Sequence, residues 1–560
     1  MILNRTTSIT CLCQLLVTVV AIVAYTGCRR AERTNPNYAD AEQQMRISDS
    51  DMGTATTDGR DSVSLDARRS NEQLESSPSP SLPWFVDATH SSGLDFHHRA
   101  GRTDDRFLPE IFGSGVLVAD FDRNGAPDIV MIGGGNPRAE GRPESARNRL
   151  YRNDGSGRFV DATESWSLPS PGYGMGGAIG DFDNDGWIDV YLTTYGGQDR
   201  LLRNTGSGFV DMTIDSGIEP DSAWSSSALF FDADNDGWLD LLVVRYVEYT
   251  QQTAVPTFFN GVHVYATPQF HDGVPDILYR NLGDGSFVPV SGFHVLGDSG
   301  SAGRENPYKG LAAGTADLNG DGLPDIYIAN DIRRNFLLIN RGNFEFEEAG
   351  QLFGVAYGET GTAQAGMGVA FAHLDDQGIP SIVCSNFQGE PANLFMPVGE
   401  MFLERSVVKG VAQATRQQLQ WGAQFFDTNN DGREELMIAN GHIYDNIEQL
   451  YTGVGFAQPN TLLQFQSGKF VDIGHRAGPA LEADQVSRGL AIADFNSDGL
   501  LDFLVSNNDD RPLLGRNATT KPGNFISIWL EGTRSNRSAI GTKIVARVGQ
   551  NKVIREVFGG

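Results

Sequence analysis

Three short signatures recur seven times along this chain, always in the same order, from residue 84 onwards. The first has the form F-x-D-x-T, the second is an acidic loop of the form D-x-[DN]-x-[DN]-G-x-x-[DE], and the third resembles N-x-L-Y-R-N. Each repeat of this kind is one supersecondary unit that buries its apolar residues only against its neighbours. We therefore expect one array of seven like units.

The runs that flank each acidic loop are short and rich in β-forming residues, such as GVLVAD before the first loop and DIVMI after it. They predict that each loop joins two strands. Four short strands per unit, with unit lengths that tolerate insertions, fit propeller blades better than a rigid solenoid. We predict an all-β fold with a seven-bladed propeller over residues 84–522. Because the signatures keep one order throughout, we expect no circular permutation of the blades, and the sequence does not indicate how the ring closes.

The acidic loops carry oxygen-bearing side chains at positions 1, 3, 5 and 9 and glycine at position 6 in six of the seven units. The candidate metal ligands are Asp120, Asp122, Asn124 and Asp128; Asp181, Asp183, Asp185 and Asp189; Asp232, Asp234, Asp236 and Asp240; Asp317, Asn319, Asp321 and Asp325; Asp427, Asn429, Asp431 and Glu435; and Asp494, Asn496, Asp498 and Asp502. The fifth loop, which has His373, Asp375, Gln377 and Ser381 at these positions, has lost most of its carboxylates.

An all-oxygen ligand set on a tight loop favours Ca²⁺ over Mg²⁺ and offers nothing to zinc. The glycine permits the sharp bend, and the backbone carbonyl of position 7 is an expected further ligand. An EF-hand is excluded because position 12 is apolar in every intact loop and the flanks are not helical. Ordinary turns also favour Asp, Asn and Gly, but six copies with an acid at the same ninth position favour about six Ca²⁺ sites.

The chain has 43 Lys and Arg against 71 Asp and Glu, a formal net charge of −28, which disfavours binding to nucleic-acid phosphates. Much of this acidity lies at the candidate ligand positions. Four cysteines in 560 residues exclude a disulfide-built scaffold. Cys384 lies in the apolar run PSIVCSNF, which predicts a buried, unreactive thiol.

The N-terminal residues 1–28 have the layout of a secretory signal: an early Arg5, an apolar run and small residues before Cys28. Gly27-Cys28 resembles the lipoprotein box, so we expect lipidation of Cys28 and a bacterial outer-membrane or cell-surface lipoprotein. Simple secretion and an uncleaved anchor are the alternatives. Residues 29–83 are polar, poor in aromatics and without periodicity, and we interpret them as a disordered tether. Membrane contact is expected only through the N-terminal lipid.

Two further motifs resemble a known family. The G-x-G that precedes several loops, as in FGSGVLVADFDRNG, resembles the FG-GAP/VCBS repeat of integrin-α-like propellers. Residues 523–560 look like the ASPIC/UnbV segment, with the hallmark G-x-x-S-N-R-x-A-I-G followed by R-E-V-x-G-G. The matching residues are Gly532, Ser535, Asn536, Arg537, Ala539, Ile540, Gly541, Arg555, Glu556, Val557 and Gly559. The chain thus resembles the cartilage-acidic-protein-like group. Since that group continues past the final Gly-Gly, we expect a β-rich C-terminal module that is truncated here.

The resemblance implies a secreted or surface-attached calcium-binding propeller that acts in extracellular binding or adhesion, without established catalytic residues. The expected partner is an unidentified protein or glycan. The insertion between the third and fourth loops contains residues 250–272, with several aromatics, His263 and His271. Long loops on a repeat scaffold often carry binding surfaces, so we expect the partner to contact this insertion.

Two other functions were weighed from the residues. The first is an exported enzyme with a site at the channel mouth, for which His97, His98 and Glu110 are the only candidates. Adjacent residues on a strand point to opposite faces, so we interpret this histidine pair as structural and assign no catalytic residue. The second is a purely structural or assembly role. Arg152, Arg203 and Arg280, each followed by an asparagine in the third signature, recur at one blade position and are interpreted as architecture.

Overall fold

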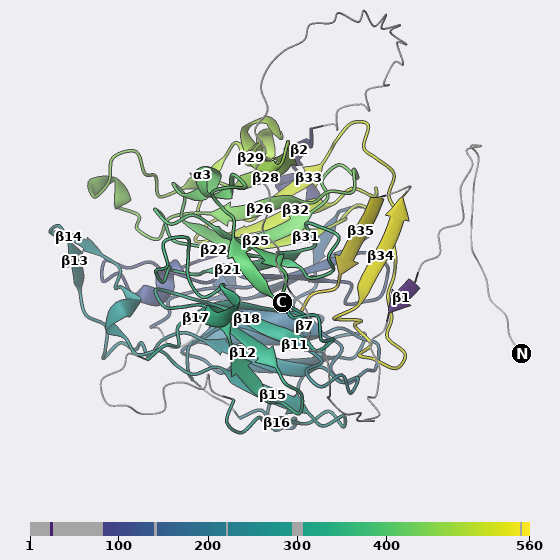
Figure 1. The fold of residues 1–560 in the computed structure, drawn as a ribbon. Coiled ribbons are helices and arrows are strands. Elements are labelled where there is room, and N and C mark those ends of the chain that lie inside the picture. The colour runs from purple at the N-terminus through teal and green to yellow at the C-terminus, as the bar shows by residue number, and fades with distance from the viewer. Residues whose placement is uncertain are drawn as a thin grey trace, which may run out of the picture. The chain divides into compact units, whose positions relative to one another are not determined.

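Seven four-stranded antiparallel sheets make up most of the computed structural model, and each is built around one acidic loop (Figure 1). The structure describes residues 23–25, 82–138, 143–219, 222–293, 306–548 and 551–559. Cys28, the tether and nearly all of the expected signal segment lie outside the described residues. The prediction of an all-β, seven-bladed propeller is confirmed.

The blades are numbered here one to seven along the chain, with their strands given from the channel outwards. They are β3 (Val116–Ala119), β4 (Asp128–Met131), β5 (Arg149–Asn153) and β6 (Phe159–Asp161); β7 (Tyr173–Gly180), β8 (Asp189–Tyr195), β9 (Arg200–Asn204) and β10 (Phe209–Asp211); β11 (Ser225–Phe231), β12 (Asp240–Arg245), β15 (Ile277–Asn281) and β16 (Phe287–Pro289); β17 (Gly310–Ala316), β18 (Asp325–Asn330), β19 (Phe336–Asn340) and β20 (Phe346–Glu348); β21 (Gly368–Ala372), β22 (Ser381–Ser385), β23 (Asn393–Val398) and β24 (Met401–Glu404); β25 (Gln420–Phe426), β26 (Glu435–Asn440), β28 (Thr461–Gln466) and β29 (Lys469–Asp472); and β31 (Ser487–Ala493), β32 (Asp502–Asn507), β33 (Leu513–Asn517) and β2 (Phe85–Asp87).

The ring closes through the strand β2, which comes from the start of the propeller and completes the last blade. It pairs antiparallel with β33, with Phe85 opposite Asn517 and Asp87 opposite Gly515. The F-x-D-x-T signature is the outermost strand of every blade, so each sequence repeat spans two blades. The expectation that the blades need no permutation is therefore wrong. The hydrogen bonds between the two ends of the propeller chain hold the ring shut.

The glycines of the G-x-G motif lie where the innermost strands converge on the channel. A Cβ atom on Gly115 would lie 2.7 Å from the Cα atom of Gly176 in the next blade. On Gly368 it would lie 2.2 Å from the carbonyl oxygen of Trp421. Only residues without a side chain permit this approach, which explains the small residues at the head of the inner strands.

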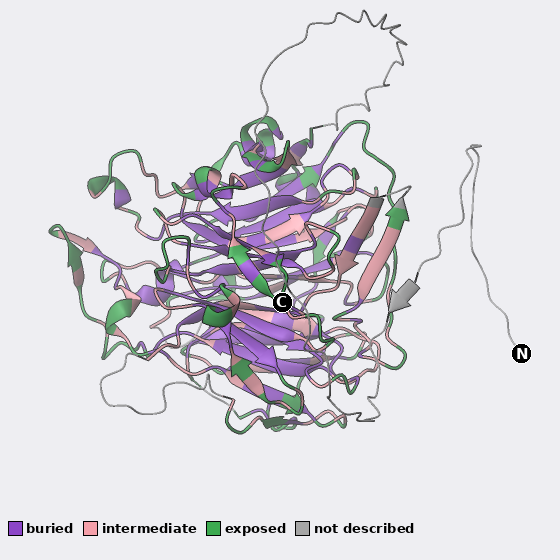
Figure 2. Ribbon diagram, viewed as in Figure 1, coloured by how far each residue is buried: buried purple, intermediate pink, exposed green. Residues whose placement is uncertain are grey.

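The apolar core lies between neighbouring blades, where the two sheet faces pack on each other (Figure 2). Between the first and second blades, Leu117, Leu150 and Leu192 are buried. The rings of Phe121 and Phe209 there pack edge to face, 5.7 Å apart. Each blade thus buries its apolar residues only against its neighbours, as the repeat predicts.

Opposite sides of the propeller carry different additions (Figure 1). The C-terminal hairpin β34 (Lys543–Val548) and β35 (Asn551–Glu556) lies on the side of the acidic loops, and β1 (Val23–Tyr25) pairs with β34. On the other side the insertion forms the hairpin β13 (Thr257–Phe259) and β14 (Val262–Val264). The remaining elements are α1 (Thr89–Ser92), α2 (Gly350–Phe353), α3 (Val411–Thr415), η1 (Leu108–Ile111), η2 (Glu144–Ala146), η3 (Pro268–Phe270), η4 (Ile447–Gln449), η5 (Gly474–Arg476), η6 (Pro479–Leu481), β27 (Gln458–Pro459) and β30 (Asp484–Gln485). Among the described residues, no helix is long and apolar enough to cross a membrane.

Candidate metal-binding loops

The six intact acidic loops share one backbone conformation. The carboxylate of position 1 accepts a hydrogen bond from the amide of the position-6 glycine, at 2.8 Å from Gly125 to Asp120 and from Gly186 to Asp181. That glycine has a left-handed backbone, with φ of +89° at Gly125 and +96° at Gly186, which explains why no other residue type occupies position 6. The loops join β-strands, as predicted, and every strand after a loop begins at position 9.

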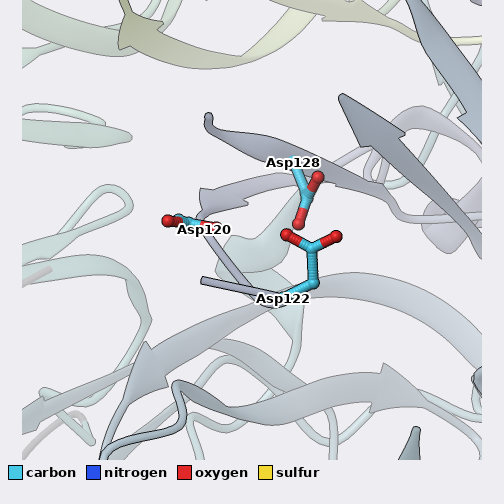
Figure 3. A group of neighbouring side chains, drawn as sticks. All are labelled: Asp120, Asp122 and Asp128. Carbon is cyan, nitrogen blue, oxygen red and sulfur yellow. The ribbon is translucent and has the colours of Figure 1, made fainter. Parts of the chain in front are cut away.

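Three of the loops bring acidic side chains within reach of one ion. Ligand atoms of Asp120, Asp122 and Asp128 lie within 4.8 Å of one another, and the equivalent groups of the second and third loops do the same. Figure 3 shows the carboxylates of Asp122 and Asp128 directed at each other. The fourth, sixth and seventh loops have asparagine at position 3, so they offer an amide oxygen there in place of a carboxylate.

The ninth-position acid is buried in every intact loop and holds two segments of its own blade together. Asp189 is fully buried, and its carboxylate oxygens accept hydrogen bonds from the amides of Phe182 (3.0 Å) and Asn204 (2.7 Å). The acids with the same two amide contacts in other blades are Asp128, Asp240, Asp325 and Asp502. Sequence reasoning assigned this acid to the metal alone and missed its role in the blade.

The final asparagine of the third signature joins neighbouring blades. The side-chain amide of Asn204 donates to the carbonyl of Phe121 in the first blade (2.9 Å) and to that of Ile188 in its own (3.0 Å). Its side-chain oxygen accepts the amide of Gly206 at 2.8 Å. The equivalent asparagines with contacts to the preceding blade are Asn153, Asn281, Asn340 and Asn517. Recurrence of this residue is therefore explained by the inter-blade contact.

The arginine of the third signature contacts the loop itself. Arg203 pairs with Asp183 (2.6 Å) and Asp185 (2.8 Å), Arg280 pairs with Asp234 (3.4 Å), and Arg152 contacts Asp122. Among the six intact loops, these three are the ones that have aspartate at position 3. The arginine thus neutralises part of the charge that a cation would otherwise compensate.

Burial raises the pKa of the loop carboxyl groups. Desolvation raises the pKa of Asp128, Asp325 and Asp502 to about 7 and that of Asp240 to about 8, despite the amide hydrogen bonds that oppose the shift. The pKa of Asp189 is raised well above its usual range for the same reason. A positive charge close by lowers the pKa of such groups and favours their ionised form.

The donor set fits a hard divalent cation. Two buried carboxylate oxygens, Oδ1 of Asp181 and Oδ1 of Asp234, have no hydrogen-bond partner in the described part of the chain. One belongs to position 1 and the other to position 3, both of which are candidate ligand positions. Buried unpaired carboxylate oxygens are costly unless a cation binds them, so the residues present suit Ca²⁺ coordination.

The fifth loop contacts the C-terminal hairpin instead. The ring of His373, at position 1, lies 2.8 Å from the carboxylate of Glu556, and both side chains are almost fully buried. The ammonium of Lys552 donates to the carbonyl of Asp376 at 2.7 Å. Position 9 is Ser381, and the strand residue in the place of Asn204 is Pro397, which has no amide hydrogen.

The C-terminal segment crosses several of the intact loops. Arg537 donates its backbone amide to the side-chain oxygen of Asn184 (3.0 Å), and its guanidinium lies 3.8 Å from Asp181. Lys543 lies 3.5 Å from Asp317, and the amide of Gly523 donates to Asn429 at 2.8 Å. Residues 523–560 carry six basic and two acidic side chains, so a basic segment covers an acidic face.

The other residues singled out in the sequence have structural contacts. His98 is fully buried, and its Nδ1 accepts the amide of Asp509 at 3.1 Å. Glu110, also buried, accepts hydrogen bonds from Thr103 and from the hydroxyl of Tyr265 in the insertion. Neither His97 nor His98 belongs to a three-residue metal-type cluster of the described chain. Cys384 is buried as predicted, and desolvation raises its pKa to about 12.

Comparison with known proteins now connects these loops to a family. The FG-GAP-like repeat family matches residues 120–192, 181–243 and 317–384, each of which runs from one acidic loop to beyond the next. Human cartilage acidic protein 1 is 24% identical over 477 residues, which cover 78% of this chain and 63% of that protein. This chain is similar to cartilage acidic protein 1, and parts of it match the FG-GAP-like repeat. The resemblance seen in the sequence is confirmed.

The cartilage acidic protein 1 of Xenopus tropicalis is 23% identical over 449 residues, which cover 72% of this chain and 60% of that protein. The chain thus spans less than two thirds of the curated relatives it matches. Among solved structures, an Agrocybe aegerita lectin described as recognising terminal N-acetylglucosamine aligns with a TM-score of 0.36 and 16% identity, covering 71% of this chain and 87% of that one.

Proposed function

We propose that this chain is an exported calcium-binding propeller that acts as an extracellular binding module. Ca²⁺ at about six loops makes the propeller rigid. The observation that carries the proposal is the pair of buried, unpartnered carboxylate oxygens of Asp181 and Asp234 within loops of one shared conformation. The residues that would hold the ions are the side chains of positions 1, 3, 5 and 9. When bound, the ion supplies charge neutralisation and crosslinks within a loop.

Thermal unfolding with and without a calcium chelator tests the ion. Each site that binds Ca²⁺ in the folded state alone adds about 2.7 kcal/mol at a hundredfold excess over Kd. Six such sites predict a fall in Tm of more than about 10 °C in EGTA. Unchanged melting in EGTA, with Mg²⁺ present throughout, would contradict the calcium proposal.

Terbium luminescence can locate the ion, because two loops carry a tryptophan at position 7. Trp187 belongs to the second loop and Trp238 to the third, and energy transfer to bound Tb³⁺ falls steeply with distance. Trp187→Phe and Trp238→Phe should each remove a large part of the sensitised emission. Trp84→Phe, outside the loops, is the control and should leave the emission unchanged. Equal emission from all three variants would show that Tb³⁺ binds elsewhere.

We further propose that the insertion is the surface that contacts the partner. Its side chains Val255, Phe258, Phe259 and Phe270 are exposed, with Phe258 at 63% and Phe270 at 72%. Tyr265 anchors it to the body by donating to Glu110 at 3.2 Å. Exposed aromatics on an anchored hairpin are typical of interaction surfaces.

Point variants test this surface without removing its anchor. Phe258→Ser and Phe270→Ser together should abolish capture of ligands identified by glycan arrays or pull-downs, at unchanged Tm. Ile214→Ser, at an exposed position on the far edge of the second blade, is the matched control. Equal capture by the two proteins would place the partner elsewhere. The N-terminal anchor is tested separately: Cys28→Ser removes the thiol that would carry the lipid, so the unlipidated protein should be released from the membrane fraction.

A further inference from the structure

At one end of the central channel, each innermost strand contributes one residue that lies between two small or polar residues. In five blades this residue lies at a β-bulge, for example between Gly174 and Gly176 or between Ser487 and Leu490. A bulge of this kind redirects a side chain out of the regular ladder. The seven equivalent residues, called here the channel ring, are Ser114, Met175, Ser226, Leu311, Met367, Trp421 and Arg488.

The channel ring lines a cavity of about 270 Å³ to which all seven blades contribute. Phe112 packs at the same end of the channel, with its ring 5.2 Å from that of Trp224 and 5.6 Å from that of Trp421. Most of the remaining lining consists of glycine, alanine and aliphatic side chains of the inner strands.

Among the described residues, Arg488 is the only charged one that lines this cavity. It is 4% exposed. Its guanidinium donates to the backbone carbonyls of Ile111, Gly441, His442 and Ser487, at 2.8–3.3 Å, and stacks 4.2 Å from the ring of Trp421. No carboxylate of the described chain forms an ion pair with it. Arginine stays protonated in proteins, so a full positive charge is buried here without a counter-charge.

Burial of a charge without an opposite charge is unfavourable, and proteins compensate such groups with a partner ion. The four carbonyls supply dipoles but no net charge. They also leave one N–H of the guanidinium without a partner, because the group has five donors. The architecture of the blade does not require this residue, since the equivalent positions in the other six blades are neutral.

Two more hydrogen-bond donors at the same end of the channel have no partner in the described residues. The hydroxyl of Ser114 is fully buried, and the indole N–H of Trp224 belongs to a side chain that is 2% exposed. Both residues line the cavity. Ser114 belongs to the first blade and Arg488 to the seventh, which are adjacent. They are linked by Ser506, whose hydroxyl donates to the Ser114 carbonyl and accepts the amide of Gly489 at 3.0 Å.

We infer that the central channel holds a small anion of the halide class at the channel ring, bound by Arg488 with Ser114 and Trp224 as further donors. A cationic group and two neutral donors without acceptors form a donor set for an anion. Burial of the Arg488 guanidinium strengthens the attraction, since its charge is screened less than in water. This site is separate from the acidic loops and does not depend on calcium.

Bromide is the probe for this site. Crystals of the protein in saturating Ca²⁺, soaked in sodium bromide, should show an anomalous peak in contact with the Arg488 guanidinium. In solution at constant ionic strength, replacing gluconate by 100 mM bromide should raise Tm by about 3 °C. Ser114→Ala should reduce this shift, and Arg488→Met should abolish it. Arg147→Met, which changes an exposed arginine, is the control and should keep the full shift.

The absence of an anomalous peak at Arg488, together with equal melting in bromide and gluconate, would overturn the inference. A Tm shift that Arg488→Met and Ser114→Ala leave unchanged would also overturn it, because the halide would then act elsewhere. Where Arg488→Met does not fold, the anomalous map and the Ser114→Ala shift decide. Loss of calcium binding in EGTA does not bear on either result, so the two proposals fail separately.

Discussion

The second and fifth acidic loops occupy the same place in their blades but differ in almost every side chain. Both turn at a glycine with a left-handed backbone, with φ of +96° at Gly186 and +92° at Gly378. The second loop has aspartate at positions 1, 3, 5 and 9, whereas the fifth retains only Asp375. The turn between the strands therefore does not require the acids, which serve another purpose.

The two blades also differ in what the ninth position contacts. In the second blade Asp189 accepts the amide of Asn204, whose side chain reaches the first blade. In the fifth blade Ser381 stands at position 9 and Pro397 at the asparagine position. Since proline has no amide to donate, the acid would lack one of its two backbone partners. The fifth blade thus lacks both the acid and the asparagine, whereas the sixth keeps the acid, Glu435, with Phe465 at the asparagine position.

The fifth loop compensates with contacts from the C-terminal hairpin. His373 occupies position 1 and pairs with Glu556, while Lys552 donates to the loop backbone. One face of the propeller therefore carries two kinds of loop, one suited to a cation and one closed by a protein segment. Four predictions test this difference.

The largest effect is expected from Asn204→Ala. The change leaves the buried carbonyl of Phe121 and the partly buried carbonyl of Ile188 and amide of Gly206 without their partner. At roughly 1–3 kcal/mol for each unsatisfied buried group, partly relieved by water, we expect a loss of about 3–5 kcal/mol. Denaturant unfolding measures it. Thr205→Ala, one residue further and exposed, should cost less than about 1 kcal/mol, and equal costs would refute the inter-blade role.

Asp189→Asn tests whether the ninth acid acts without metal. The new amide group cannot accept both backbone hydrogen bonds, since one of its two heavy atoms is a donor. In EGTA we expect a loss of about 2–3 kcal/mol from this change and less than about 1 kcal/mol from Ser381→Ala in the fifth blade. A stable Asp189→Asn protein in EGTA would mean that the acid serves the ion alone.

The propeller could be predicted from the sequence because its repeats are internally consistent. Seven copies of three signatures specify the blade number, the apolar residue at position 12 excludes an EF-hand, and the β-rich flanks predict strands on both sides of each loop. The ring closure could not be predicted, because β2 and β6 carry the same F-x-D-x-T signature and nothing local tells a strand which blade it joins. Only the pairing of Phe85 with Asn517 decides it.

The candidate ligands could be named from the spacing of the acidic residues alone, but the hydrogen bonds that these residues accept from the backbone of the blade could not be predicted. The carboxylate of Asp189 looks like a ligand in sequence because the pattern cannot show that Phe182 and Asn204 donate to it. The contact of Arg203 with the loop could not be read from the repeat either, because the seventh blade has Arg516 at the same place and asparagine at position 3 of its loop. Arg488 could not be identified from the repeats, because it does not recur: the equivalent residues of the channel ring in the other six blades are neutral.

Arg203→Gln should separate arginine from calcium as the source of charge compensation in the second loop. Without Ca²⁺ the cost should be below about 1 kcal/mol, because the guanidinium is partly exposed and its ion pairs are screened. With Ca²⁺ the loop should bind more tightly, by roughly three- to tenfold, since a competing cation has gone. Calorimetric titration measures both. Arg341→Gln, which breaks an exposed pair with Glu347, is the control, and unchanged affinity in both variants would exclude competition.

A small effect is also expected at the fifth loop, from Glu556→Gln. The amide keeps a hydrogen bond to His373 at the 2.8 Å contact but loses the charge that faces Lys543 at 3.7 Å. We expect a loss of about 1 kcal/mol, and the same loss in EGTA, because this loop is closed by protein and not by an ion. Glu482→Gln, at an exposed position, should change nothing. If the cost of Glu556→Gln disappears in EGTA, then docking of the hairpin on the fifth loop depends on metal in the neighbouring loops, and the two kinds of loop act as one unit.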